Sequence, residues 1–164
     1  MDNTFLISEH DIMEALQHVM DPEIPTLSVV DMGMITVVEV KGESAEVKMI
    51  PTFTACPALK LIKQNIYDAV KQLGFNQVNV IVDDTIIWNS DRITEQGKKL
   101  LTEFGLGTPQ RHEGKFSMEE IAASKCPHCG SDDTTLKSIF GSTLCRSIHF
   151  CFNCKQGFER FKPL

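Results

Sequence analysis

The sequence has no long hydrophobic run. Its first residues, MDNTFLISEHDIMEAL, lack the basic start and the continuous apolar stretch of a secretory signal peptide. No apolar segment approaches the roughly 20 residues that a transmembrane helix needs. These absences predict a cytoplasmic protein with no membrane partner.

The sequence also lacks the patterns that identify common enzymes. It contains no nucleotide-binding glycine loop, no pair of acids and no nucleophile with a base at recognisable spacing. Internal repeats and low-complexity tracts are absent as well. We therefore expect a protein without catalytic turnover of its own.

What is present is the composition of a globular protein. The chain has 164 residues, of which 42% are hydrophobic and 23% charged, enough for one domain with its own core and a small appendage. The net charge of −6 divides into −9 for residues 1–124 (10 Lys and Arg, 19 Asp and Glu) and +3 for residues 125–164 (6 and 3). A basic excess this small is typical of a solvated surface, so nucleic acid is not an expected partner.

The first two thirds of the chain alternate between helical and strand-like patterns. Apolar spacing after the capping pair Ser8 and Asp11 predicts a first helix, and Pro57 and Gly74 frame the longest apolar stripe. The expected elements are a helix over 9–20, strands over 34–40 and 45–50, a helix over 57–73, a strand over 76–82 and a helix over 92–103. We expect Trp88 to cover the core of this domain.

These elements predict the α+β class. The order αββαβα gives a small two-layer domain with a three-stranded sheet over residues 1–105, followed by a linker at 106–124 that contains a short helix. A zinc-ribbon-like module with four cysteine ligands is expected over 125–164.

Two C-x-x-C pairs define that module. Cys126 and Cys129 are separated by twenty-one residues from Cys151 and Cys154. Each pair brings two thiolates together from a tight turn, and two pairs complete a tetrahedral site. About 40 residues bury too little surface to fold alone, so the metal is expected to stabilise the module.

Several metals accept four thiolates. Zinc is favoured for a closed structural site, while mononuclear iron and an iron-sulfur cluster remain alternatives. Cys145 is either an alternative ligand, a reactive thiol or a free buried cysteine. His128 and His149 are expected near the site without ligating it, because four cysteines fill the tetrahedron.

Cys56 lies where the second helix is expected to start, and a helix N-terminus favours a thiolate. Acidic residues on loops could approach it, namely Asp21, Glu23 and Asp31. The alternative interpretation makes Cys56 a small buried residue and these acids turn or cap residues.

Three segments carry a resemblance to a known family. They are Asp21-Pro-Glu23, Val29-Val-Asp31-Met-Gly33-Met-Ile35 and Thr52-Phe-Thr-Ala-Cys56-Pro57. Together they resemble the iron-sulfur assembly accessory family that includes SufT, over residues 8–105. With Cys126-Pro-His-Cys129-Gly-Ser131, Phe140-Gly-Ser-Thr-Leu-Cys145-Arg146 and Cys151-Phe-Asn-Cys154, the whole chain resembles the accessory proteins encoded with the bacterial phenylacetyl-CoA epoxidase.

The resemblance implies a function in aerobic phenylacetate breakdown. The protein would help an iron-sulfur cluster reach the iron-sulfur reductase component of the epoxidase, with Cys56 as a reactive residue or transient cluster ligand. The family's acidic positions fall on Asp21, Glu23 and Asp31, and its hydroxyl positions on Thr52 and Thr54. Members of the family often form dimers, which the residues themselves neither support nor contradict.

Two other functions compete with this one. The protein could be a structural subunit of the epoxidase complex, or a nucleic-acid-binding zinc ribbon. The second alternative rests on basic and aromatic residues near the cysteines, although the aromatics are expected to pack the module. These residues are Lys137, Arg146, Lys155, Arg160, Lys162, Phe140, Phe150, Phe152, Phe158 and Phe161.

Overall fold

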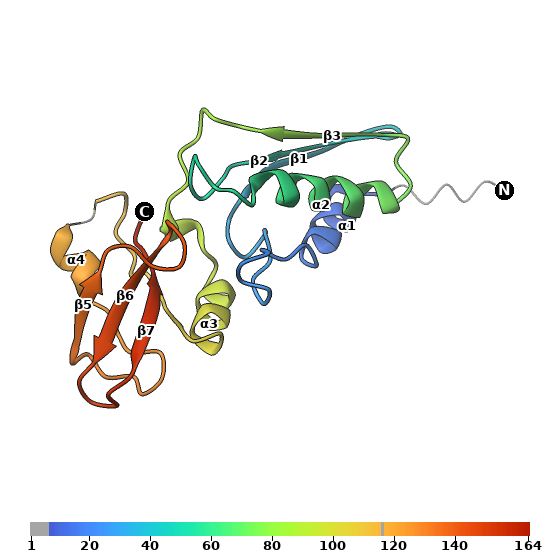
Figure 1. Ribbon diagram of the computed structural model, residues 1–164. Coiled ribbons are helices and arrows are strands. Elements are labelled where there is room, and N and C mark those ends of the chain that lie inside the picture. Colours follow the sequence, from blue (N-terminus) through green and yellow to red (C-terminus); the bar gives the residue numbers. More distant parts are fainter. Residues whose placement is uncertain (1–6, 116) are drawn as a thin grey trace. The chain divides into compact units, whose positions relative to one another are not determined.

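The computed structural model of the chain describes residues 7–115 and 117–164, and Figure 1 shows its elements. The chain divides into two compact units. The first contains the described residues up to Pro51 together with Pro57–Ile87, and the second contains Thr52–Cys56 and Trp88–Leu164. No helix among the described residues is both long and apolar enough to cross a membrane.

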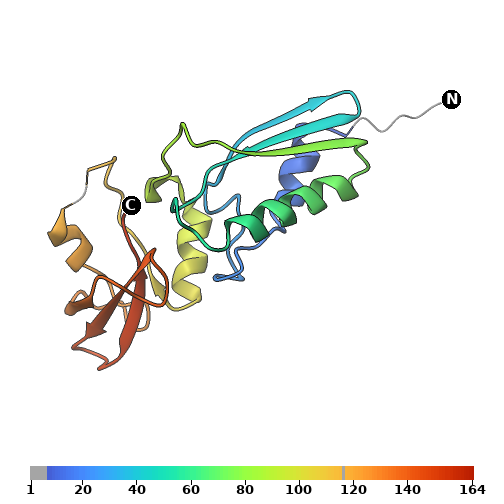
Figure 2. The same ribbon diagram turned by 45° about the horizontal axis from the view of Figure 1, so that its top comes forward.

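The first unit is a three-stranded sheet with two helices on one face. Strands β1 (Ile35–Lys41) and β2 (Ser44–Met49) pair antiparallel, and β2 pairs in parallel with β3 (Gln77–Val82), in the order β1-β2-β3. Helices α1 (Glu9–Leu16) and α2 (Leu59–Gln72) lie on the same side of this sheet (Figures 1 and 2). The α+β class and the three-stranded sheet are therefore confirmed.

Alternating side chains seal the two layers together. On β2, Ala45, Val47 and Met49 are buried, and the intervening residues are partly exposed. The apolar stripe predicted on α2 contributes three buried residues, and Gly74 ends the segment at a φ of 106°, which favours glycine. The buried stripe consists of Ile62, Ile66 and Val70.

Helix α1 ends four residues earlier than predicted. Its capping box is present, because the Ser8 hydroxyl accepts from the N–H of Asp11 and the Asp11 carboxylate accepts from the N–H of Ser8. After Leu16 the backbone turns to pair with a later segment, and the N–H of Val29 donates to the carbonyl of Val19 at 2.9 Å. This nonlocal pairing ends the helix before its apolar spacing does.

The second unit is built on a four-stranded sheet. Strands β5 (Thr134–Ser138), β6 (Arg146–Cys151) and β7 (Gly157–Phe161) pair antiparallel, and β4 (Leu106–Gly107) adds a short parallel strand beside β7. This unit also contains the 3₁₀ helix η1 (Ser90–Arg92) and helices α3 (Glu95–Glu103) and α4 (Met118–Ala122).

This arrangement differs from the predicted division of the chain. Helix α3 was expected to close the first domain, but it lies in the second unit, and residues 106–107 of the expected linker form β4. The short helix expected in that linker is present as α4. The compact units separate between Ile87 and Trp88, whereas the predicted first domain extends to residue 105.

Arg160 joins β4, β7 and α4 inside the second unit. Its side chain is 1% exposed, and its Nη1 donates to the carbonyls of Glu120 and Ile121 at 2.6 and 3.0 Å near the end of α4. Beside it, a Cβ at Gly107 would lie 2.8 Å from Ser124 Oγ and 3.2 Å from Arg160 Cβ. Only glycine fits there without displacing its neighbours.

Trp88 packs against a different core from the one predicted. Its ring meets that of Phe161 on β7 edge to face, with centroids 5.8 Å apart, and the side chain is 4% exposed. Since both residues belong to the second unit, the only tryptophan of the chain reports on that unit rather than on the first domain.

A buried polar cluster ties the start of the second unit to its last residues. Ser90 Oγ lies 3.0 Å from His112 Nε2, and the N–H of Ser90 donates to the carbonyl of Leu164 at 2.9 Å. The N–H of Gly114 donates to His112 Nδ1 at 3.1 Å, which places the proton of the neutral imidazole on Nε2, facing Ser90. Because Ser90 is 1% exposed and faces a donor instead of a base, this pair is structural.

Asp91 completes the cluster and yields a stability prediction. Its carboxylate accepts the N–H groups of His112 and Glu113 at 3.0 and 2.6 Å. We expect Asp91→Ala to lower the free energy of unfolding of the second unit by about 1–3 kcal/mol, because two backbone donors lose their acceptor. Urea unfolding followed by Trp88 fluorescence measures this. Asp132→Ala, at a carboxylate that is 82% exposed, is the control, and equal effects of the two substitutions would contradict the prediction.

Candidate metal centre and the Cys56 loop

The second unit brings the four predicted ligand cysteines together. The Sγ atoms of Cys126, Cys129, Cys151 and Cys154 all lie within 4.8 Å of one another. Cys126 Sγ is 3.7 Å from Cys154 Sγ, and Cys129 Sγ is 3.6 Å from Cys151 Sγ. All four are free thiols, so the cluster is not held by disulfides.

Two similar backbone turns present these sulfur atoms. In the first, the N–H of Gly130 donates to the carbonyl of Cys126 at 2.9 Å, and in the second the N–H of Lys155 donates to the carbonyl of Cys151 at 3.0 Å. Both donors have left-handed backbone, with φ of 74° at Gly130 and 61° at Lys155. The local sequence of each pair therefore forms a knuckle that points two thiols inward.

This donor set fits a tetrahedral metal ion. With Zn–S bonds of about 2.3 Å, the sulfur atoms of a tetrahedral site are about 3.8 Å apart, close to the two distances above. Cys126 and Cys151 are 1% and 0% exposed, so one ligand from each knuckle is buried. The four thiols can hold a closed structural metal with no open position for a substrate.

The surroundings of the thiols are partly apolar. Phe158 on β7 packs with Cys126, Cys151 and Cys154, and its ring stacks on His149 with centroids 5.4 Å apart. Burial, followed by the charge of Arg160, lowers the pKa of His149 to about 4, so the imidazole is neutral at pH 7.

The Cys129 side of the site is more polar. Asn153 Nδ2 donates to Cys129 Sγ at 3.5 Å. This hydrogen bond, aided by the N–H of Ser131, lowers the pKa of Cys129 to about 6. The thiolate form that binds metal is therefore favoured at this position.

The other candidate ligands lie outside this group of four. Cys145 is half-buried, and its Sγ is 3.0 Å from Thr143 Oγ1. His128 meets the edge of Phe158 at 6.4 Å, and His149 is 0% exposed beside Ser147 Oγ at 2.9 Å. Both histidines pack around the metal centre through Phe158.

Cys56 lies in an exposed loop. Its side chain is half-buried, and its N–H donates to the carbonyl of Phe53 at 3.0 Å, which closes a turn over 53–56. Thr54 is exposed and Thr52 half-buried. Helix α2 starts at Leu59 after the N-cap Ala58, whose side chain makes no capping hydrogen bond, so Cys56 precedes the helix instead of starting it.

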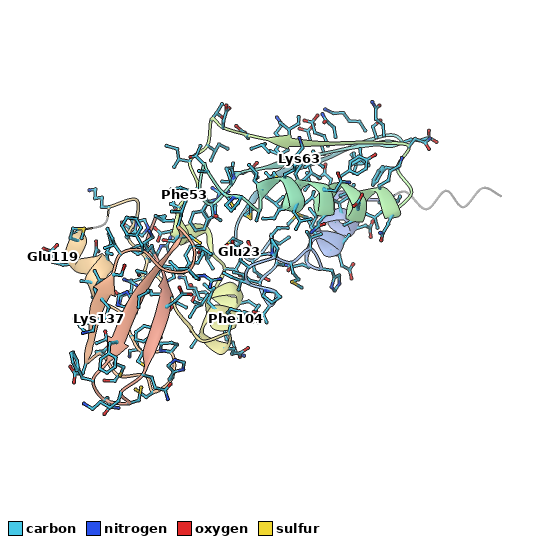
Figure 3. The ribbon with its side chains drawn as sticks, viewed as in Figure 1. Glu23, Phe53, Lys63, Phe104, Glu119 and Lys137 are labelled. Carbon is cyan, nitrogen blue, oxygen red and sulfur yellow. The ribbon has the colours of Figure 1, made fainter. Side chains whose placement is uncertain are left out.

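The predicted acidic residues shape a loop of the first unit. Asp21 Oδ1 accepts from the N–H groups of Glu23 and Ile24 at 2.8 and 3.0 Å, and Asp31 Oδ2 lies 2.9 Å from Ser28 Oγ. Asp21 is 9% exposed, whereas Glu23, labelled in Figure 3, is half-buried. The turn and cap interpretation of Asp21 thus has direct geometric support.

The residues behind the nucleic-acid alternative separate into two groups. Arg146 and Arg160 are 7% and 1% exposed, and Phe158 and Phe161 are also buried. Phe140 and Phe152, however, are 63% and 42% exposed, which differs from the expectation that all the aromatics pack the module. Sequence reasoning missed the positions of Asn153 and Phe158 beside the thiols, and their type and spacing carry no signal of it.

Comparison with known proteins divides the chain along similar lines. Residues 9–82 match the family described as iron-sulfur cluster assembly protein, and residues 110–162 match the PaaD zinc beta ribbon domain. In fold, the chain is similar to a DUF59 domain of unknown function from Bacillus anthracis (TM-score 0.53, 23% identity, covering 57% of this chain and 90% of that one). A conserved hypothetical protein from Thermotoga maritima is similar too (TM-score 0.51, 25% identity, 57% and 92%).

Two curated relatives extend the comparison. A Porphyromonas gingivalis protein named Fe-S protein maturation auxiliary factor is 36% identical over 99 residues, which are 58% of this chain and 92% of the relative. An Escherichia coli K12 protein, named as a subunit of 1,2-phenylacetyl-CoA epoxidase, is 34% identical over 153 residues, 93% of this chain and 92% of the relative. The chain accordingly belongs to the PaaD family, which includes this epoxidase subunit.

Proposed function

We propose that this protein is a non-catalytic accessory factor that supplies an iron-sulfur cluster to the phenylacetyl-CoA epoxidase, its client being the iron-sulfur reductase component. The supporting observation is the joint presence, in one chain, of an iron-sulfur cluster assembly region and the zinc ribbon of the PaaD family, with a relative named as an epoxidase subunit that matches nearly the whole length.

In this proposal Cys56 is a transient ligand of iron in the cluster. Its loop is exposed on both sides, with Phe53 37% exposed, so a cluster and a client cysteine can both reach the sulfur. Release is a ligand exchange in which a client thiolate replaces the Cys56 sulfur on iron, without a change of oxidation state. Glu23, Thr52 and Thr54 are the polar groups proposed to tune it, while Asp21 and Asp31 hold the acidic loop in shape.

The four-cysteine site has a separate task. We assign it zinc, held by Cys126, Cys129, Cys151 and Cys154, because a closed S₄ site stabilises a small module and leaves no position for a substrate. Zinc there supplies folding free energy, and the cluster is cargo that binds elsewhere.

The test is Cys56→Ser in cells that depend on this protein for epoxidase activity. We expect the iron and acid-labile sulfide of the purified reductase component to fall about tenfold or more, since serine is a poor ligand for such clusters. Cys145→Ser, at the other half-buried thiol outside the metal centre, is the matched control. Unchanged cluster occupancy with Cys56→Ser would exclude the proposed role of this residue.

A structural subunit is the second candidate, favoured by the name of the Escherichia coli relative. It predicts that the protein co-purifies with active epoxidase in stoichiometric amount and that Cys56→Ser changes nothing. An accessory factor instead leaves active enzyme after the cluster is loaded.

A further inference from the structure

The sheet of the second unit has two very different faces. On β6, the buried residues Ser147, His149 and Cys151 alternate with Ile148 and Phe150, which are exposed and half-buried. Phe152 follows on the same side, 42% exposed and edge to face with Phe150. We name the face that carries Ile148, Phe150 and Phe152 the outer face; the metal centre belongs to the opposite one.

The loop between β5 and β6 extends this apolar surface. The N–H of Ser142 donates to Glu159, which stands opposite Ile148 in the pairing of β6 with β7, so the loop folds over the same side of the sheet. Three of its side chains remain in water, Ile139 at 41%, Phe140 at 63% and Leu144 at 46% exposure. Large apolar groups that gather in this way mark an interaction site on a folded protein.

The first unit shows what a solvated sheet face looks like in the same chain. The side of β1 and β2 that faces away from the helices carries Glu39 with Lys41 and Glu46 with Lys48, joined as ion pairs at 2.6 and 3.9 Å. That face is polar and its charges are compensated. The outer face of the second unit is neither.

The charge that remains on the outer face is positive. Its carboxylate, Glu159, is compensated by Arg146 at 3.0 Å. Lys137, labelled in Figure 3, and Lys162 lie over the rings of Phe150 and Phe140 at 5.6 and 5.9 Å, and no ion pair among the described residues includes either lysine. The surface therefore has an apolar centre with two uncompensated cations beside it.

From this we infer that the outer face is the docking surface for a protein partner whose contact patch is apolar with carboxylates around it. The inference rests on the proposed function, which makes an epoxidase component that partner. Charge complementarity selects an acidic partner. A second copy joined by a two-fold axis through this face would instead bring lysines against lysines.

Nucleic acid is the weaker occupant. Single strands stack on ring faces, but here the faces of Phe150 and Phe140 already carry lysine ammonium groups, and Ile139, Leu144 and Ile148 offer no plane for stacking. Aliphatic and aromatic side chains together are typical of the centre of a protein interface.

The experiment measures binding of the full zinc-loaded chain to each purified epoxidase component by biolayer interferometry. We expect the double variant Phe140→Ser with Ile148→Ser to bind the partner component about tenfold or more weakly. Lys137→Glu with Lys162→Glu should slow association and reduce the salt dependence between about 50 and 500 mM NaCl. The matched control is Leu61→Ser with Tyr67→Ser on α2, whose side chains are 50% and 37% exposed.

Zinc content and circular dichroism verify that each variant is folded. If the outer-face variants bind as tightly as wild type, the inference is wrong while the proposed function stands. If instead they bind weakly but Cys56→Ser leaves the client's cluster intact, docking stands and the cluster role fails. Loss of a dimer, or of salt-dependent binding to a single-stranded oligonucleotide, with component binding unchanged would assign the face to another occupant and overturn the inference. Binding of no component by wild type overturns both.

Discussion

Cys126→Ser is expected to unfold the ribbon sheet of the second unit. A structural zinc ion contributes about 10–16 kcal/mol to the folding of small modules at pH 7, which equals or exceeds the roughly 5–15 kcal/mol stability of an ordinary domain. Cys126 is 1% exposed among Cys151 and Phe158, so serine would place an unpartnered hydroxyl in that apolar cluster as well. We expect zinc to fall from one equivalent to a small fraction and the Trp88 emission to shift to that of a water-exposed indole.

The control for this substitution is Cys145→Ser, which removes a thiol of the same unit that lies outside the group of four. It should retain one zinc per chain and the wild-type emission. Full zinc content together with a native Trp88 spectrum in Cys126→Ser would mean that the four thiols do not hold the metal, and iron in place of zinc would correct its identity.

Phe158→Ala should give the second largest loss of stability. The ring is 5% exposed and touches three of the four thiols and both neighbouring histidines, so its removal leaves a cavity that zinc prevents from collapsing. Large-to-small substitutions of buried phenylalanine cost about 3–5 kcal/mol. Urea unfolding followed by Trp88 fluorescence should show a lower midpoint with zinc still bound.

Phe152→Ala is the companion variant, because this ring is also close to the second knuckle but is 42% exposed. Its cost should stay below about 1 kcal/mol. Similar unfolding midpoints for the two variants would show that the packing of Phe158 does not stabilise the unit.

Local patterns were sufficient to predict much of the fold. The turn between β1 and β2, the apolar stripe of α2 and the two C-x-x-C knuckles are each written in fewer than about twenty consecutive residues, and the structure contains all of them. The four thiols meet because the spacing within each pair already sets its turn.

What the sequence could not predict depends on partners far along the chain. Leu106 and Gly107 look like a linker because a two-residue strand has no periodicity, and they become β4 only beside Glu159 and Arg160. Helix α3 and Trp88 are likewise periodic or apolar without indicating which core they join. The exposed group of Phe140, Ile148 and Phe152 was missed for the same reason, since aromatic residues near metal ligands usually pack inward.

The pairing of β4 with β7 sets an order of events during synthesis. Everything that the first sheet needs has been translated once β3 and its connection have left the ribosome, at residue 87. The second sheet must wait for β7 near the other end of the chain, and until then α3 and β4 emerge with nothing to pack against. At about 5–20 residues per second, several seconds pass in which nascent chains carry a completed first unit joined to two exposed knuckles. Capture of zinc is therefore the last step in making this protein, and a cell short of zinc should accumulate chains with a folded first unit and an unfolded second one.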